Sequence, residues 1–144
     1  MASANTTEVF NCTRAEFFKL VSDYEKYPQF LPEVKSVKIT QNKGSHKEME
    51  YQVSLIKTFK YRLKIHEKEN ELVEFEFIDG EVFKTMKGTW KLKDKEPGRC
   101  EVDYTVEATF GLLVPGPMAK TLVSVNLPIM MANFKKRVKE VYGK

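Results

Sequence analysis

The sequence predicts an α+β fold, in which a curved antiparallel sheet of about seven strands wraps around one long C-terminal helix. Three observations support this prediction. One strand and two short helices are expected first, apolar residues alternate with polar ones over 34–110, and apolar residues recur with helical spacing over 123–141. The chain has 144 residues, which is the usual length of one domain, and we expect a single domain over 1–144.

The N-terminal segment is expected to form a strand followed by two short helices. Thr7–Asn11 is rich in β-branched and aromatic residues, which favour a strand. Thr13 and Glu16 have the spacing of a capping box, in which each side chain accepts the backbone N–H of the other residue. The first helix should therefore run to about Ser22, and a second short helix should cover 24–30, where prolines limit its length.

The middle of the chain is expected to form strands joined by tight turns. From Val34 onward, apolar residues alternate with polar or charged ones, which is typical of strands with one buried face. Asp79–Gly80 and Glu96–Gly98 are turn signals between such runs, so neighbouring strands should pair as hairpins. A sheet of this kind has one solvated face and one face that must be covered.

The C-terminal segment is expected to cover that face. Its apolar residues recur at spacings of three and four, which indicates a helix with one apolar side. Pro128 lies inside the segment, and an interior proline costs about 3 kcal/mol unless it is accommodated. We therefore expect a kink or break near 126–128, with Asn126 capping a new segment. The predicted buried stripe is Val123, Leu127, Met131, Phe134, Val138 and Val141.

The space between sheet and helix is a candidate ligand cavity, because a curved sheet and a helix diverge at one end. The alternative is that the inward residues form only a core. Three inward tyrosines carry hydroxyls that need partners, and a cavity with a few polar anchors satisfies them more easily than a dry core does. A second apolar stripe on the helix could face the same space. The candidate ligand-binding residues are Tyr51, Val53, Phe59, Tyr61, Phe83, Met86, Trp90, Tyr104, Val106 and Phe110 in the sheet, and Leu122, Val125 and Ile129 in the helix.

Three further features border the predicted cavity, and each has a structural alternative. Lys84 lies two residues before Met86, so strand alternation places both on the inward face and would aim the Lys84 ammonium group at a ligand oxygen. Alternatively, the side chain extends into solvent, or a one-residue slip of the strand turns it outward. The proline-bounded corner around Phe30 and Leu31 would line the entrance or only fasten the short helix to the sheet. Loop 110–118 carries three consecutive large aliphatic residues, which indicate a gate, a peripheral membrane contact, a partner surface or packing under the helix.

Composition and motifs argue against several classes of protein. Two cysteines are too few for a disulfide-rich scaffold or a four-cysteine metal site. Only 4 of the 24 basic residues are Arg and the net charge is +4, which argues against a DNA partner. His46 and His66 are not spaced as metal ligands and no nucleophile motif is present, so no metal and no catalytic residue are expected. Without a signal-peptide pattern or an apolar run of about 18 residues, the protein is expected to be cytoplasmic, at most peripheral to the inner membrane.

Three strings of the sequence resemble one family. They are Val21–Pro32, Asp79–Trp90 and Lys139–Tyr142, and together with the order of elements they cover nearly the whole chain. The sequence resembles the START/Bet v1-like (SRPBCC) superfamily with its helix-grip fold, and within it the coenzyme Q-binding and polyketide cyclase/dehydrase-like group that includes the ribosome-association toxin. Glu81–Val82, which lengthens a turn, and Pro128 depart from the group's pattern near the expected cavity.

The resemblance implies binding, transport or sequestration of a hydrophobic small molecule, such as an isoprenoid quinone or other lipid, between the sheet and the C-terminal helix. Burial of an apolar tail contributes about 25 cal/mol per Å², so few polar contacts are needed. That quinone or lipid is the only cofactor-like group expected. Two alternatives remain: a ribosome-associating interaction protein, as in the toxin, and an aromatase/cyclase-like enzyme that shapes its substrate. Enzymatic activity is the less expected outcome.

Overall fold

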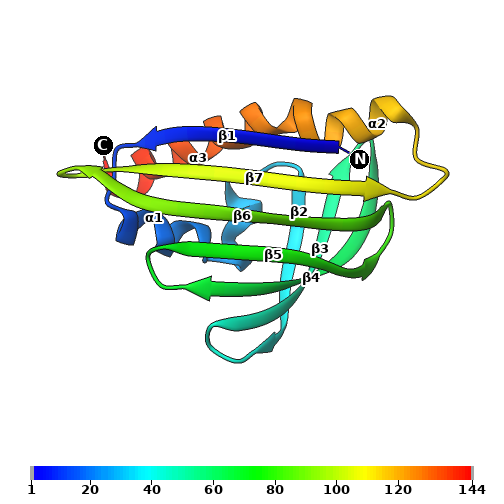
Figure 1. Ribbon diagram of the computed structural model, residues 1–144, viewed down its shortest axis with the longest axis horizontal. Helices are drawn as coiled ribbons and strands as arrows, with labels where there is room; N and C mark the ends of the chain where they lie inside the picture. The colour runs from blue at the N-terminus through cyan, green and yellow to red at the C-terminus, as the bar shows by residue number, and fades with distance from the viewer. Residues whose placement is uncertain (1, 144) are drawn as a thin grey trace.

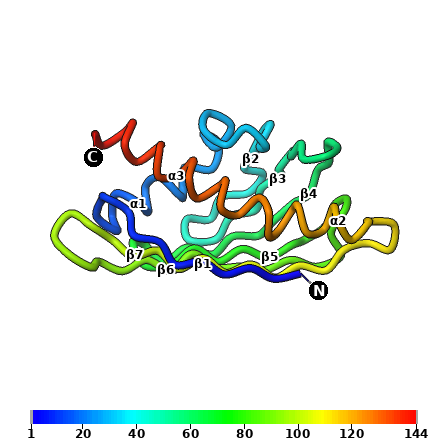
Figure 2. Tube along the Cα trace, turned by 90° about the horizontal axis from the view of Figure 1, so that it is seen from above, coloured from blue at the N-terminus to red at the C-terminus, as the bar shows by residue number. Residues whose placement is uncertain are grey.

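The computed structural model describes residues 2–143 and has the predicted α+β architecture (Figure 1). The order of elements is β1 (Ala2–Phe10), α1 (Arg14–Val21), η1 (Tyr24–Gln29), β2 (Val34–Asn42), β3 (His46–Leu55), β4 (Lys57–Lys68), β5 (Leu72–Gly80), β6 (Phe83–Glu96), β7 (Arg99–Phe110), α2 (Gly116–Lys120), η2 (Thr121–Val125) and α3 (Asn126–Tyr142). Seven strands form one antiparallel sheet in the order β1-β7-β6-β5-β4-β3-β2. The C-terminal helix lies along one face, and β2 to β4 turn up beside it (Figure 2).

The first strand begins at Ala2, five residues before the predicted start at Thr7. The early residues are polar and lack the apolar alternation, but β7 offers them matching partners. The side-chain amide of Asn5 donates to the Asp103 carboxylate at 2.9 Å and to the Thr105 hydroxyl at 2.7 Å. Cross-strand polar pairs of this kind stabilise an edge strand that its own pattern does not reveal.

The predicted capping box at the start of α1 is confirmed. The backbone N–H of Glu16 donates to the Thr13 hydroxyl at 3.1 Å, and the N–H of Thr13 donates to the Glu16 carboxylate at 2.9 Å. Two otherwise unpartnered donors of the helix N-terminus are thereby satisfied. The buried face of the helix then fixes α1 against the sheet through Phe17, whose ring lies 4.5 Å from Phe10 and 6.0 Å from Trp90.

The predicted helical stripe is buried except for Val141, which lies in the last turn and is 51% exposed. The expected cap at Asn126 is wrong, because its side chain donates to the Glu33 carboxylate instead. Its backbone and that of Val125 are helical, so the helix does not break at Pro128. A π-helical segment, η2, directly precedes α3. A wider turn of this kind accommodates Pro128, which has no N–H to donate to the preceding turn.

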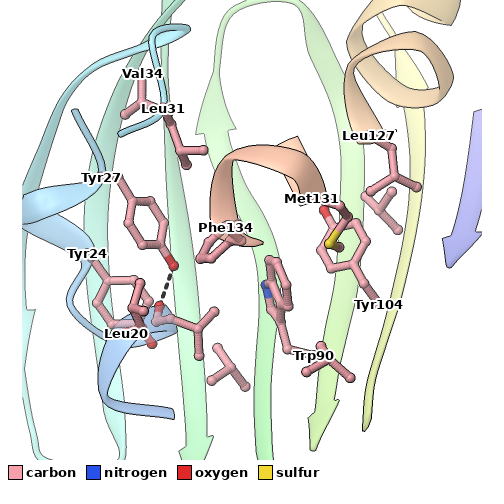
Figure 3. Close-up of a cluster of buried hydrophobic side chains, with 14 of the residues drawn as sticks. Leu20, Tyr24, Tyr27, Leu31, Val34, Trp90, Tyr104, Leu127, Met131 and Phe134 are labelled. Atoms are coloured by element: carbon pink, nitrogen blue, oxygen red, sulfur yellow. Dashed lines mark hydrogen bonds between the residues drawn. The ribbon is translucent and has the colours of Figure 1, made fainter. Parts of the chain in front are cut away.

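A cluster of aromatic rings packs the end of the sheet nearest α1 (Figure 3). Phe134 of α3 is fully buried, and its ring lies 5.1 to 6.0 Å from those of Trp90, Phe17 and Tyr27. Within residues 2–143, no helix combines the length and the apolar character needed to cross a bilayer.

Candidate ligand-binding cavity

A cavity of about 160 Å³ lies between the sheet, the corner after η1 and the C-terminal helix. It is lined almost entirely by apolar and aromatic side chains, which come from β2 to β7 and from η2 and α3. Eleven of the predicted site residues line it: Leu31, Tyr51, Val53, Phe59, Tyr61, Phe83, Met86, Trp90, Tyr104, Val106 and Leu122. The alternation of inward and outward residues along the strands therefore located the sheet side of the cavity.

Lys84 does not point toward the cavity, contrary to the orientation predicted from parity. The pairing of β6 with β7 shifts register between Phe83 and Thr85, as in a β-bulge. Phe83 and Met86 both face inward, so the two residues between them are exposed on the other face of the sheet. The lysine lines a shallow hollow on that outer face, beside Thr85 and Thr109.

The second apolar stripe of the helix also faces mainly away from the cavity. Leu122 lines the cavity, but Val125 and Ile129 are exposed on the outer side of the helix. They follow Val123 and Leu127 of the buried stripe by two positions, and two residues turn a helix by about 200°. The inward positions of this segment are instead those of the buried stripe and its neighbours.

Two aromatic residues of the predicted site serve the core around the cavity rather than its lining. Phe30 packs its ring 5.0 Å from that of Phe134, and the Arg137 guanidinium lies 5.2 Å above it. Phe30 therefore fastens the corner after η1 to α3, and not to the sheet as the structural alternative expected, while Leu31 of the same corner lines the cavity. Phe110 packs against Phe83 at 5.2 Å, and it thus supports a lining residue from behind.

The polar groups of the cavity are chiefly tyrosine hydroxyls. Tyr51, Tyr61 and Tyr104 line it, and none of their hydroxyls forms a hydrogen bond with another residue of 2–143. No fully buried side-chain oxygen or nitrogen in this range lacks a partner, so these three hydroxyls are open to the space of the cavity. Burial raises the pKa of all three phenols well above the ordinary value, so they remain protonated donors. The rings are held in place by their neighbours: Tyr51 stacks on Tyr61 at 5.4 Å, and Tyr104 lies 4.5 Å from Trp90.

Two other tyrosines of the wall are already satisfied by protein partners. The hydroxyl of Tyr27 donates to the carbonyl of Val21, shown by the dashed line in Figure 3. The hydroxyl of Tyr24 donates to the Glu67 carboxylate, which also pairs with Lys47 at 2.7 Å. Burial raises the pKa of both phenols. Tyr24 therefore fixes η1 to β4 and Tyr27 fixes it to the end of α1, whereas the first three keep their donors for the cavity.

A carboxyl group that the sequence analysis missed also lines the cavity. Glu33 is 9% exposed, and its Oε2 atom accepts a hydrogen bond from the Asn126 side-chain amide at 3.1 Å. The pair joins the start of β2 to the start of α3 at the wall of the cavity. No apolar period marks a glutamate after a proline, so the sequence gives no signal for Glu33; Asn126 lies three residues after Val123 and could have been assigned to the same face.

The remaining missed lining residues follow patterns already visible in the sequence. They alternate with outward residues on the strands or continue the helical stripe, and only their proximity to the cavity was unforeseen. They are Tyr24, Tyr27, Val34, Ile65, Val73, Phe75, Val123, Leu127, Met130 and Phe134. Leu55 and Leu63 also line the cavity, as strand alternation predicts.

Metal ligation has no support in the part of the chain that the structure describes. Residues 2–143 contain no group of three or more His, Cys, Asp or Glu side chains arranged to hold an ion. His46 and His66 stack at 4.6 Å across β3 and β4 on the outer face of the sheet, and His66 contacts the Glu74 carboxylate at 2.9 Å.

Taken together, the lining residues of the cavity offer hydroxyl and amide donors, one carboxyl group and a large apolar surface.

Comparison with known proteins agrees with this architecture. A Vibrio cholerae protein described as ribosome association toxin RatA is 26% identical over 155 residues, covering 99% of both chains. A START superfamily protein from Mycobacterium smegmatis has a TM-score of 0.85 at 21% identity, covering 96% of this chain and 98% of its own. The Zhui aromatase/cyclase from Streptomyces sp. R1128 has a TM-score of 0.84 at 10% identity, covering 94% and 92%. At such identities, the structural likenesses establish a shared fold.

The family assignment comes from the sequence match over most of the chain. Residues 11–135 match the family described as polyketide cyclase / dehydrase and lipid transport. This match begins just after β1 and extends into α3, so it includes all sides of the cavity. The chain therefore belongs to the polyketide cyclase/dehydrase and lipid transport family and has the START-type helix-grip fold.

Proposed function

We propose that this protein binds and sequesters a hydrophobic small molecule with an oxygen-bearing ring, of the isoprenoid quinone or lipid class, in the cavity beneath the C-terminal helix. The observation that carries the proposal is the group of three hydroxyls, on Tyr51, Tyr61 and Tyr104, which line an apolar cavity without protein partners. Ligand oxygens would accept from these donors.

The size of the cavity supports a ring rather than a tail as the buried part. A cavity of about 150 Å³ lined by apolar side chains holds one benzene-sized molecule, and this cavity measures about 160 Å³. A ring stacked among Trp90, Tyr104 and Tyr61 would occupy it, while an isoprenoid tail would leave between η2 and the sheet. Partly exposed Leu122 and Phe83 line that side and offer the tail an apolar path.

Fluorescence titration with a quinone that carries one isoprene unit tests the proposal, because Trp90 is the single tryptophan and lines the cavity. We expect saturable quenching in wild type, and about tenfold weaker binding in Tyr51→Phe/Tyr61→Phe, which removes two donors and little volume. Tyr142→Phe is the matched control, since its hydroxyl donates to the Glu16 carbonyl outside the cavity. Equal affinity in all three proteins would contradict the role of the hydroxyls.

Native mass spectrometry of protein purified without detergent, with organic extraction of the same sample, tests the ligand class. A stoichiometric added mass that extracts as a quinone or lipid supports the proposal. A ligand-free mass, together with no quenching by the added quinone, would contradict it.

Ribosome association is the second candidate, and the likeness to the RatA toxin over almost the full chain favours it. The surface charges weigh against it. Outer-face lysines are neutralised by carboxylates on neighbouring strands: Lys64 lies 3.1 Å from Glu76, and Lys93 lies 3.0 Å from Glu101. Co-sedimentation with ribosomes that falls steeply with rising salt would support this function. In either case we propose a cytoplasmic location.

A further inference from the structure

The open end of the fold carries the most exposed large apolar side chains of residues 2–143. Leu112 and Leu113, between β7 and α2, are fully exposed, and Ile56, between β3 and β4, is 70% exposed. Large aliphatic residues held in solvent lose the stabilisation that burial gives, about 25 cal/mol per Å². A cluster of them at one end of a molecule marks an interaction surface.

The two leucines are held away from the core by the local backbone. The N–H of Gly111 donates to the Val82 carbonyl at 2.9 Å, and the N–H of Val114 donates to the Gly111 carbonyl at 3.1 Å. These bonds close a turn with Leu112 and Leu113 at its tip. In Figures 1 and 2, the loop between β7 and α2 extends beyond the end of the sheet. The leucines therefore form a projecting tip.

The other exposed residues lie at the same end of the molecule. The turn between β5 and β6 bonds to the start of β4 through the Glu81 N–H and the Lys60 carbonyl at 2.9 Å, and to Gly111 through Val82. The hairpin turn that carries Ile56 lies at this end in both views (Figures 1 and 2). The tip with Leu112 and Leu113 and the turn with Ile56 therefore lie at the same end of the molecule.

Three exposed lysines lie on β4 and α2, the elements next to this apolar tip. Lys57, Lys60 and Lys120 are exposed, and none of them forms an ion pair with another residue of 2–143. The nearby Glu81 carboxylate accepts the backbone N–H of Lys60. Lysine ammonium groups around an apolar tip complement a surface that is negative outside and apolar inside, as an anionic bilayer is.

We propose that this surface, made of Ile56, Leu112, Leu113, Lys57, Lys60 and Lys120, docks on an anionic lipid bilayer. A second copy of the chain fits the surface less well, because a two-fold contact would bring the same lysines against each other. Leu55, at the end of β3, and Phe83, at the start of β6, border two of these loops and line the cavity. If the proposed function also holds, a ligand could pass from the bilayer to the cavity without crossing water.

Vesicle flotation tests the docking. We expect wild type to float with vesicles of phosphatidylcholine and phosphatidylglycerol, and to bind vesicles of phosphatidylcholine alone about tenfold more weakly. Leu112→Ser/Leu113→Ser should lower binding to the anionic vesicles about tenfold. Lys57→Gln/Lys60→Gln/Lys120→Gln should remove the preference for anionic lipid. Val141→Ser is the matched control, because Val141 is half-exposed at the other end of α3, and it should float like wild type.

Three results would overturn the docking proposal: no flotation of wild type, equal flotation of the leucine variant, or sedimentation showing a wild-type dimer that the leucine substitutions dissociate. Quinone quenching of Trp90 in vesicle-free buffer keeps the two proposals separate. Leu112→Ser/Leu113→Ser should bind the quinone like wild type, because neither leucine lines the cavity. Loss of vesicle binding with normal quenching supports docking, whereas vesicle binding without quenching would contradict only the proposed function.

Discussion

The two ends of the space between sheet and helix differ in how they are filled. At the end near α1, Phe10, Phe17 and Phe134 are almost completely buried, and their rings meet at 4.5 to 5.8 Å. At the other end, Phe83 and Leu122 remain partly exposed around a cavity. The sheet and the C-terminal helix supply both ends, so the same two layers hold a dry core and a binding site. The difference teaches that side chains of the packed end contribute mainly to stability, whereas those of the cavity end can be altered at a smaller cost in stability.

The largest expected effect comes from opening a void at the packed end. Phe134→Ala removes a fully buried ring that contacts Phe17, Tyr27, Phe30 and Trp90. It should lower the free energy of unfolding by about 3–5 kcal/mol in denaturant titration.

The matched substitution at the cavity end is Leu122→Ala, whose side chain is partly exposed beside an existing space. It should lower the free energy of unfolding by less than about 2 kcal/mol. Equal losses in the two variants would show that the ends do not differ in packing.

Alkaline pH should weaken the fold through the buried tyrosines of both ends. Burial raises the pKa of Tyr27, Tyr61 and Tyr104 in the folded state, while an unfolded tyrosine ionises near pH 10. Above about pH 10 the unfolded chain therefore binds fewer protons, and each such residue removes up to about 1.4 kcal/mol of stability per pH unit.

The stabilising contribution of these phenols is complete below pH 10 and is lost as the pH rises toward their folded-state pKa. Tyr61→Phe should reduce the slope of unfolding free energy against pH above about pH 10, and it should leave the stability at about pH 7 nearly unchanged. An unchanged slope would mean that Tyr61 ionises equally in both states.

The smallest expected effect is that of Lys84→Ala on ligand affinity. The side chain is exposed on the face of the sheet opposite the cavity, so quinone quenching of Trp90 should match wild type within about twofold. Loss of affinity similar to that of Tyr51→Phe/Tyr61→Phe would indicate that the bulge near Phe83 shifts and turns the lysine inward on binding.

Alternation of apolar residues predicted most of the sheet and eight of the eleven predicted residues that line the cavity, because burial of one face requires that pattern. The same rule failed for Lys84, since a bulge changes parity within a strand and depends on the partner strand. Helical spacing failed for Val125 and Ile129, because two apolar stripes on one helix look alike in sequence and only the position of the sheet selects between them. Glu33 could not be predicted, because its burial depends on Asn126, 93 residues away.

The labelling rate of Cys12 and Cys100 can report how often the packed end opens. Both thiols are fully buried where β1 leaves its partner β7, and the hydrogen bond from Cys12 lowers the pKa of Cys100. A thiol reagent can reach them only when this end opens, so its labelling rate in native buffer measures the free energy of that opening. Since the chain has two cysteines and both lie at the packed end, opening of the cavity end alone would leave the labelling rate unchanged.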